Sequence, residues 1–232
     1  MYKQLRERVL KANLLLGKSG LVTLTWGNVS EIDRENGVVA IKPSGVSYDN
    51  MRWEDVVVVD LKGNKVAGEL NPSSDTPTHL YLYNAFPEIG GIVHTHSRWA
   101  TVYSQAKKDI PALGTTHADA FYGDVPCTRD LTDEEINGEY EMQTGKVIAE
   151  TFTNRSPLEV PAVLVASHGP FAWAKNGLKA VENAIILEEV AMMAWHTKKL
   201  DEEVTFKQSL ADKHYFRKHG ASAYYGQKEK KT

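Results

Sequence analysis

The feature that most constrains this chain is a pair of histidines at the end of an apolar stretch. Ile92 and Val93 follow the glycine pair 90–91, and this composition predicts a short buried strand entered from a turn. Side chains alternate along a strand, so His94 and His96 should lie on one face of it. Because two imidazoles on one face can share a metal ion, we expect the chain to fold around that face.

A third histidine stands in a similar setting. Residues 162–166 predict another apolar strand, which ends at Ser167-His168 before a Gly-Pro turn. Three neutral imidazoles would hold one ion and leave a position open for substrate, as catalytic zinc sites do. A lone histidine at a strand end is more often hydrogen-bonded structure, but His94, His96 and His168 together favour a metal.

Composition is that of an ordinary globular protein and argues against several functions. The 232 residues are enough for one sizeable core, so we expect a single domain over residues 1–232. A formal charge of −3 argues against a nucleic-acid partner. Cys127 is the only cysteine, and neither an N-terminal signal core nor an apolar run of about 18 residues occurs. We therefore expect a cytoplasmic protein with no membrane partner.

Hydrophobic spacing predicts the elements. Leu5, Val9, Ala12 and Leu16 recur at helical spacing, which predicts a helix over residues 2–17. Short apolar stretches joined by turns predict antiparallel strands. They cover residues 21–25, 38–42 and 56–59. Further helices are predicted at 76–86, 99–105 and 178–199, and at the capping box that begins at Thr132.

Three stretches could receive an anion. Lys42 ends a strand before the turn Pro43-Ser44-Gly45, which offers an ammonium, a hydroxyl and backbone N–H groups. Ser73 and Ser74 precede a helix that should begin near Asp75, where unpaired N–H groups favour an anion. At Gly27-Asn28 the glycine permits close approach of a ligand. Each stretch alone is more often a turn or a helix cap than a binding site.

The segment 114–123 and the C-terminal tail carry the remaining candidates. His117 and Asp119 lie in a loop rich in glycine, threonine and aromatic residues, where either could be catalytic. Residues 212–220 and 224–227 are rich in aromatic and titratable groups, which is unusual for a tail. Spacing alone assigns none of these groups a role.

Together these motifs resemble the class II aldolase/adducin family, and within it the branch of L-ribulose-5-phosphate 4-epimerases. The resemblance covers nearly the whole chain. The family motifs are matched by residues 23–30, 42–46, 72–79, 91–97 and 167–173, and the tail of the epimerase branch by residues 212–215 and 223–227.

The resemblance implies an α/β fold of three layers, α/β/α, with a largely antiparallel central sheet. It also implies a homotetramer with active sites at subunit interfaces. One zinc ion per subunit, replaceable by other divalent metals, would be held by His94, His96 and His168, with Asp75 as an acidic ligand or neighbour. The phosphate of a sugar-phosphate substrate would be bound by Gly27, Asn28, Lys42, Ser44, Gly45, Ser73 and Ser74. Asp119 and Tyr225 would be the acid/base pair, supported by His214 and supplied by a neighbouring subunit.

The implied activity is the zinc-dependent interconversion of L-ribulose 5-phosphate and D-xylulose 5-phosphate in pentose catabolism, for instance of L-arabinose. C4 carries no acidic hydrogen, so it is inverted more easily by breaking and re-forming the C3–C4 bond, with a metal ion as Lewis acid and acid/base groups on both sides of the aldehyde. One alternative is a class II aldolase, such as one cleaving L-fuculose 1-phosphate, which carries Glu where this chain has Asp75. Another is a non-enzymatic scaffold like the adducin head domain, expected to lack an intact metal-ligand set.

Overall fold

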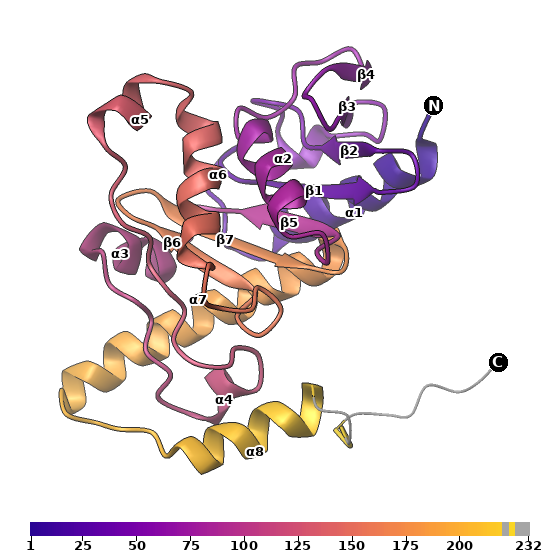
Figure 1. Cartoon of the computed structure of the whole chain (residues 1–232). Coiled ribbons are helices and arrows are strands. Elements are labelled where there is room, and N and C mark those ends of the chain that lie inside the picture. Colours follow the sequence, from indigo (N-terminus) through magenta and orange to yellow (C-terminus); the bar gives the residue numbers. More distant parts are fainter. Residues whose placement is uncertain (220–222, 226–232) are drawn as a thin grey trace.

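The computed structural model describes residues 1–219 and 223–225 (Figure 1). Gly226 and Gln227 of the predicted tail motif lie outside the described residues. The strands of this part are β1 (Asn28–Asp33), β2 (Val38–Ile41), β3 (Val57–Asp60), β4 (Lys65–Ala67), β5 (Gly91–His94), β6 (Ala162–Val165) and β7 (Gly169–Ala174). Its helices are α1 (Lys3–Lys18), the 3₁₀ helix η1 (Tyr48–Asn50), α2 (Thr76–Ala85), α3 (Arg98–Ala106), α4 (Thr115–Ala118), α5 (Asp133–Asn137), α6 (Tyr140–Thr151), α7 (Gly177–Leu200) and α8 (Gln208–His219).

These strands form one sheet in the order β4-β3-β2-β1-β5-β7-β6. Each neighbouring pair in that order is antiparallel, which confirms the predicted sheet. β5 lies between β1 and β7, and the register places His94 opposite Asn28 on one side and Phe171 on the other. Residues far apart in the sequence therefore meet at the end of β5.

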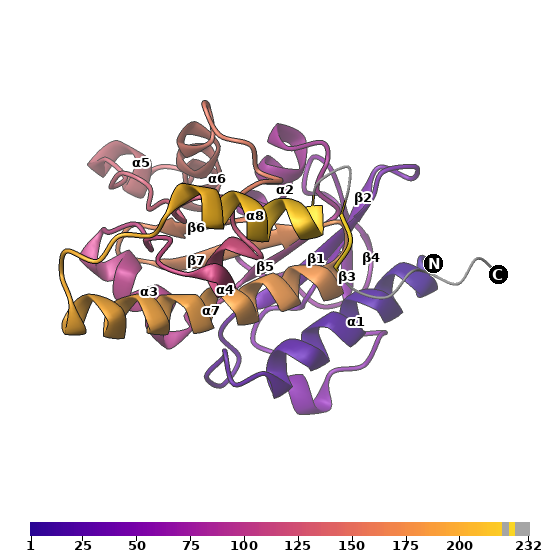
Figure 2. The ribbon, with the colours of Figure 1, turned by 90° about the horizontal axis from the view of Figure 1, so that it is seen from below.

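Helices cover both faces of the sheet and give the predicted three layers (Figure 2). α1, α3 and α7 lie on one face, and α2 and α6 pack together on the other. The apolar positions that the spacing predicts in α1 are buried: Leu5, Val9, Ala12 and Leu16. In α7 the buried apolar face includes Ala180, Ala184, Leu187, Ala191 and Ala194. Within the described ranges, no helix is both long and apolar enough to span a bilayer.

The predicted strand over residues 21–25 is wrong. These residues form a turn in which the Trp26 N–H donates to the Thr23 carbonyl oxygen at 3.1 Å. Leu24 has a left-handed φ of 54°, and its side chain is 79% exposed. An apolar composition therefore does not make this segment part of the sheet.

The first strand, β1, begins at Asn28 and buries polar side chains. The Ser30 hydroxyl lies 2.7 Å from His79 Nδ1 and 2.8 Å from the Tyr83 hydroxyl. Glu31 accepts a hydrogen bond from the Gly177 N–H at 3.0 Å, at the start of α7. Because these polar groups have partners inside the protein, a strand with a polar sequence can lie in the middle of the sheet.

Residues 212–219 of the aromatic-rich tail belong to the helix α8, which packs against α4 (Figures 1 and 2). The Tyr122 hydroxyl donates to Asp212 Oδ1 at 2.8 Å, and its ring packs on Tyr215 and Phe216. α4 is a single turn inside the segment that we expected to be a loop. The packing of α8 places its polar side chains beside Asp119, at the end of α4.

Candidate functional site

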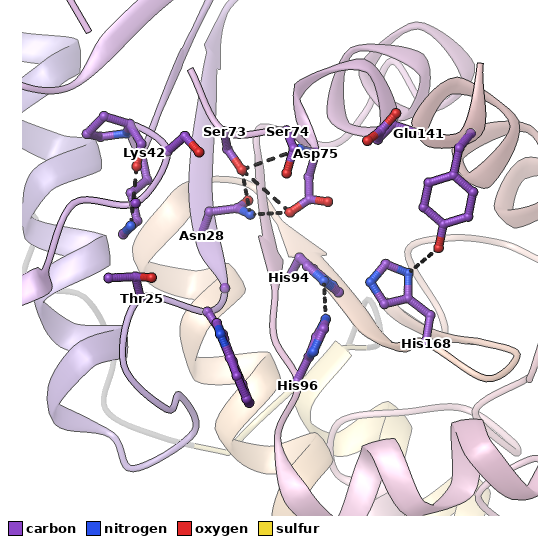
Figure 3. Close-up of a pocket in the computed structure, with 16 residues that line it drawn as sticks. Thr25, Asn28, Lys42, Ser73, Ser74, Asp75, His94, His96, Glu141 and His168 are labelled. Carbon is purple, nitrogen blue, oxygen red and sulfur yellow. Dashed lines mark hydrogen bonds between the residues drawn. The ribbon is translucent and has the colours of Figure 1, made fainter. Parts of the chain in front are cut away.

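Three imidazoles meet beyond the end of β5 (Figure 3). His94 is the last residue of β5, His96 follows it, and His168 lies in the turn between β6 and β7. Their ligand atoms all lie within 4.8 Å of one another, and their ring centroids are 4.8 to 5.0 Å apart. The structure thus brings together the three predicted histidines as a group that could hold a metal ion.

Hydrogen bonds orient the rings for such an ion. His94 Nδ1 lies 3.0 Å from the Pro170 carbonyl oxygen, so Nδ1 carries the hydrogen and Nε2 presents a lone pair. That Nε2 faces His96 Nε2 at 3.1 Å. Two imidazole nitrogens this close need a proton or a cation between them, and a divalent metal meets that need. The Tyr140 hydroxyl lies 3.3 Å from His168 Nδ1 and can orient the third ring.

Burial favours the metal-binding, neutral form of His96 and His168. It lowers the pKa of His168 to about 4, an effect to which His94 and His96 add. The pKa of His96 is also lowered, first by burial and then by His94. Neutral imidazole is the form that donates its lone pair to a metal ion.

Two glycines allow the backbone to pass close to the histidines. Gly27 has a φ of 91°, and a Cβ at this position would lie 2.8 Å from the His94 carbonyl oxygen. A Cβ on Gly169 would lie 2.7 Å from the Thr95 carbonyl oxygen. A side chain at either position would separate β5 from its neighbouring segments.

Asp75 lies in the same cavity but outside the group of three histidines. It is the N-cap residue of α2, yet its side chain makes no capping bond. Its Oδ2 accepts a hydrogen bond from Asn28 Nδ2 at 2.6 Å. Burial raises the pKa of this carboxyl, but His94, His79 and the Asn28 hydrogen bond outweigh it, so the net pKa is below the usual value. A carboxylate therefore faces the group of three histidines, and its role as a ligand stays a prediction.

A cavity of about 430 Å³ joins the histidines to the predicted anion-binding residues (Figure 3). All seven line it: Gly27, Asn28, Lys42, Ser44, Gly45, Ser73 and Ser74. Tyr140 and Glu141, at the start of α6, also line it and were not predicted. Their local sequence carries no signal, because the packing of α6 on α2 places them there; the Thr78 hydroxyl donates to the Glu141 carbonyl oxygen at 2.6 Å.

Two of the predicted anion-binding stretches meet through backbone hydrogen bonds after β2. Pro43 and Pro72 form an isolated antiparallel bridge. The Ser73 N–H donates to the Lys42 carbonyl oxygen at 3.0 Å. Asn28 joins from β1, with its Nδ2 3.1 Å from Ser73 Oγ. Asn28 Oδ1 is buried and has no partner among the described residues, which leaves an acceptor for a ligand.

Lys42 places a positive charge in this part of the cavity. It is only 2% exposed, and its Nζ lies 4.9 Å from the centroid of the Tyr48 ring. Its one hydrogen bond, at 3.3 Å, is to the Pro43 carbonyl oxygen, and no described carboxylate pairs with it. Burial lowers the pKa of this ammonium to about 8. A buried cation with so few partners favours an anion beside it.

Asp119, His214 and Tyr225 lie together, but they do not line this cavity. Asp119 Oδ1 accepts a hydrogen bond from His214 Nδ1 at 3.0 Å, and both Oδ atoms lie 3.0 Å from Arg217 Nη2. The Tyr225 ring packs over Arg217. Within one chain the predicted acid/base residues form a second cluster on α4, α8 and residues 223–225, and their supply from a neighbouring subunit stays a prediction.

Comparison with known proteins connects this geometry to a family. The profile of the class II aldolase and adducin N-terminal domain matches residues 7–195. The chain belongs to the class II aldolase and adducin family. It is similar to an L-fuculose 1-phosphate aldolase, with 29% identity and a TM-score of 0.78 over 92% of this chain and 95% of that one. YgbL from Klebsiella pneumoniae shares the fold, with 24% identity and a TM-score of 0.73 over 92% of this chain and 98% of that one.

The chain is therefore of the metal-dependent aldolase and epimerase type. The three histidines could supply the metal ligands that such chemistry needs. The family match ends at residue 195, before α8, and so it does not cover His214 or Tyr225.

Proposed function

We propose that the protein is a zinc-dependent sugar-phosphate epimerase that interconverts L-ribulose 5-phosphate and D-xylulose 5-phosphate. The observation that carries this proposal is one cavity with a three-histidine group at one end and a buried lysine at the other. A ketose phosphate has matching groups, a phosphate and neighbouring oxygens on C2 and C3. Imidazole ligands suit zinc, and other divalent ions could replace it.

The lysine end of the cavity would anchor the phosphate. The Lys42 ammonium supplies the charge, and three serine hydroxyls and the Gly45 N–H supply direction. The serines are Ser44, Ser73 and Ser74. Asn28 borders this end, and its Nδ2 holds Ser73 Oγ in place at 3.1 Å. An anchored phosphate keeps the aldehyde fragment in the site while its carbonyl group turns over.

The reaction breaks and re-forms one carbon–carbon bond. A base takes the proton of the C4 hydroxyl, and the C3–C4 electron pair passes to the fragment that carries C3. A divalent cation held by the histidines would supply Lewis-acid stabilisation of the negative charge. The aldehyde then turns, the bond forms on its opposite face, and a second group protonates the new C4 oxygen.

We assign these proton transfers to Asp119 and Tyr225, with His214 as the hydrogen-bond partner of Asp119. Both lie outside the cavity of their own chain, so the proposal includes a homotetramer in which a neighbouring chain brings them to it. Two observations support this assembly: the cluster is preformed, and Tyr225 is 61% exposed. We also propose a cytoplasmic location, in keeping with the single free Cys127.

Incubation of the zinc-loaded protein with L-ribulose 5-phosphate tests the proposal. We expect D-xylulose 5-phosphate to form, and we expect Asp119→Asn and Tyr225→Phe to lower kcat at least about 100-fold while metal content is retained. Absence of product with zinc, cobalt and manganese alike would refute the epimerase activity.

A second candidate is cleavage of L-fuculose 1-phosphate, because an aldolase acting on that sugar is 29% identical to this chain. We rank it second because the resemblance places Glu in such aldolases where this chain has the shorter Asp75. Net release of dihydroxyacetone phosphate from L-fuculose 1-phosphate, without epimerisation of L-ribulose 5-phosphate, would reverse this order. A non-enzymatic scaffold, the third alternative, would take up no stoichiometric metal.

A further inference from the structure

Arg217 lies at the centre of the cluster on α4 and α8. Its Nη2 is 3.0 Å from both carboxylate oxygens of Asp119, a residue 98 positions away in the sequence. Its Cζ lies 5.0 Å from the centroid of the Tyr225 ring. Its carbonyl oxygen accepts the N–H groups of Tyr224 at 3.0 Å and Tyr225 at 3.1 Å. One residue thus contacts both groups to which we assign proton transfer.

We propose that Arg217 is the positioning residue of this cluster, holding the Asp119 carboxylate and the Tyr225 ring together as one unit. The inference rests on the proposed function, in which Asp119 and Tyr225 act on the substrate. Arg217 acts through these two groups, since the cation is already paired with the carboxylate and covered by the ring.

The chemistry of arginine suits this role better than that of its neighbours. Lys218 Nζ lies 3.1 Å from Asp119 Oδ2 and 4.4 Å from the Tyr225 centroid, and His219 Nε2 donates to the Asp119 carbonyl oxygen at 3.0 Å. A lysine ammonium is a point charge, whereas a guanidinium has donors in a fixed plane and a flat face that packs on an aromatic ring. Lys218 adds charge, and Arg217 adds orientation.

The ion pair between Arg217 and Asp119 is partly shielded from water. The side chains of Asp119 and Arg217 are 19% and 24% exposed. Burial raises the pKa of the Asp119 carboxyl, but hydrogen bonds from Arg217, Lys218 and His214 outweigh it and hold the pKa below its usual value. The cluster thus keeps Asp119 as a carboxylate, the form that accepts a proton.

NMR of the full-length protein without substrate tests the pairing. In protein with ¹³C-labelled aspartate, Arg217→Met should raise the pKa of Asp119 by about one unit, and Arg217→Lys, which keeps a charge, should raise it less. In protein with 3-fluorotyrosine, the Tyr225 resonance, assigned with Tyr225→Phe, should shift in both Arg217 variants. Arg129→Lys is the matched control, because Arg129 also pairs with carboxylates, those of Glu135 and Glu150. It should leave both signals unchanged.

Kinetics tests the consequence. We expect both Arg217 variants to lower kcat at least about 10-fold with KM and metal content near those of the wild type. In Arg217→Met the acidic limb of the kcat/KM profile should also move to higher pH, because a raised pKa leaves less Asp119 carboxylate at low pH. Circular dichroism checks folding, and Arg217→Lys supplies the tyrosine and kcat readouts where Arg217→Met does not fold.

An unchanged Asp119 titration in Arg217→Met, or an unchanged Tyr225 resonance or kcat in either variant, overturns the inference. A wild-type protein that does not epimerise L-ribulose 5-phosphate instead refutes the proposed function. In that case the two NMR measurements still support or overturn the pairing by Arg217.

Discussion

The ammonium of Lys42 is buried at the end of β2 with one carbonyl oxygen as its hydrogen-bond partner. Charge in such a place costs folding free energy, because the unfolded chain exposes it to water. Burial lowers its pKa from 10.5 to about 8, which is the same cost expressed as proton affinity. The folded protein keeps this destabilising charge, and we propose that its function is to bind the substrate phosphate.

We therefore predict that Lys42→Met raises the free energy of unfolding at pH 7 by about 1–3 kcal/mol. Between pH 8 and 10.5 the unfolded chain binds more protons than the folded one, so wild-type stability gains on the variant as pH rises. Urea unfolding at pH 7 and pH 9.5 should show the difference shrinking. Lys11→Met, on the exposed side of α1, is the control and should change little. A variant less stable than the wild type at pH 7 would contradict this account.

The three imidazoles support a prediction about metal. Wild-type protein should bind about one divalent ion per chain, and His96→Asn should weaken zinc binding at least about 100-fold by removing one of three ligands. Mass spectrometry of the metal content and calorimetry with zinc measure this. His196→Asn, on α7 beside Trp99 and Trp195, is the control and should bind as the wild type does. Equal affinities for zinc in both variants would show that His96 is not a ligand.

Among the elements, the turn before β1 sets the distance between β1 and the histidines. Gly27 and Gly20 both have left-handed φ values, 91° and 78°, but their surroundings differ. A Cβ on Gly27 would meet the His94 carbonyl oxygen at 2.8 Å, whereas one on Gly20 would meet nothing within 4 Å. Comparing alanine substitutions at Gly20 and Gly27 therefore distinguishes the cost of backbone strain from the cost of a steric clash.

Gly20→Ala should cost only backbone strain, about 1 kcal/mol, whereas Gly27→Ala should cost about 2–4 kcal/mol because it adds a clash with the strand that carries His94. Chemical denaturation measures both costs. Zinc affinity should fall in Gly27→Ala and stay unchanged in Gly20→Ala. Equal losses of stability would mean that the chain relieves the clash without moving β5.

At the element scale, apolar spacing predicted α1 and α7 but not α4, α6 or α8. The stripe that begins at Leu5 identified α1, because a helix on the surface of a sheet has one apolar side. Residues 21–25 were misjudged because apolar composition alone cannot reveal the left-handed turn at Leu24. β1 was missed because Ser30 and Glu31 find partners in distant elements, which no local pattern displays.

For the whole molecule, some of the residues that line the cavity could be predicted, but the arrangement of its parts could not. His94 and His96 could be predicted as candidate metal ligands because both lie at the end of one apolar stretch. Tyr140 and Glu141 were not, since only the packing of α6 on α2 brings them to the cavity. The spacing of Asp119 and Tyr225 likewise gave no hint that both surround Arg217.

Two separate clusters on one chain lead to a prediction about mixed oligomers. His96→Asn and Tyr225→Phe should each be inactive alone, because each lacks one half of a shared site. Equal mixtures, unfolded and refolded together, should recover about a quarter of the wild-type activity if neighbouring chains complete each site. A mixture as inactive as its components would show that both halves serve the same chain, or that the halves do not act together.

The contact between α4 and α8 also bears on the design of chimeras. α8 lies beyond the end of the family match, so a chimera could be designed by adding α8 alone to a relative. Transferred alone onto a relative with no acidic residue at the matching turn, α8 would carry an arginine and a lysine without a counter-ion, because the carboxylate that they face belongs to the turn at Asp119. A successful graft must therefore carry two pieces of sequence, the donor helix and the acceptor turn, and a one-piece exchange should yield repulsion between cations in place of a working unit.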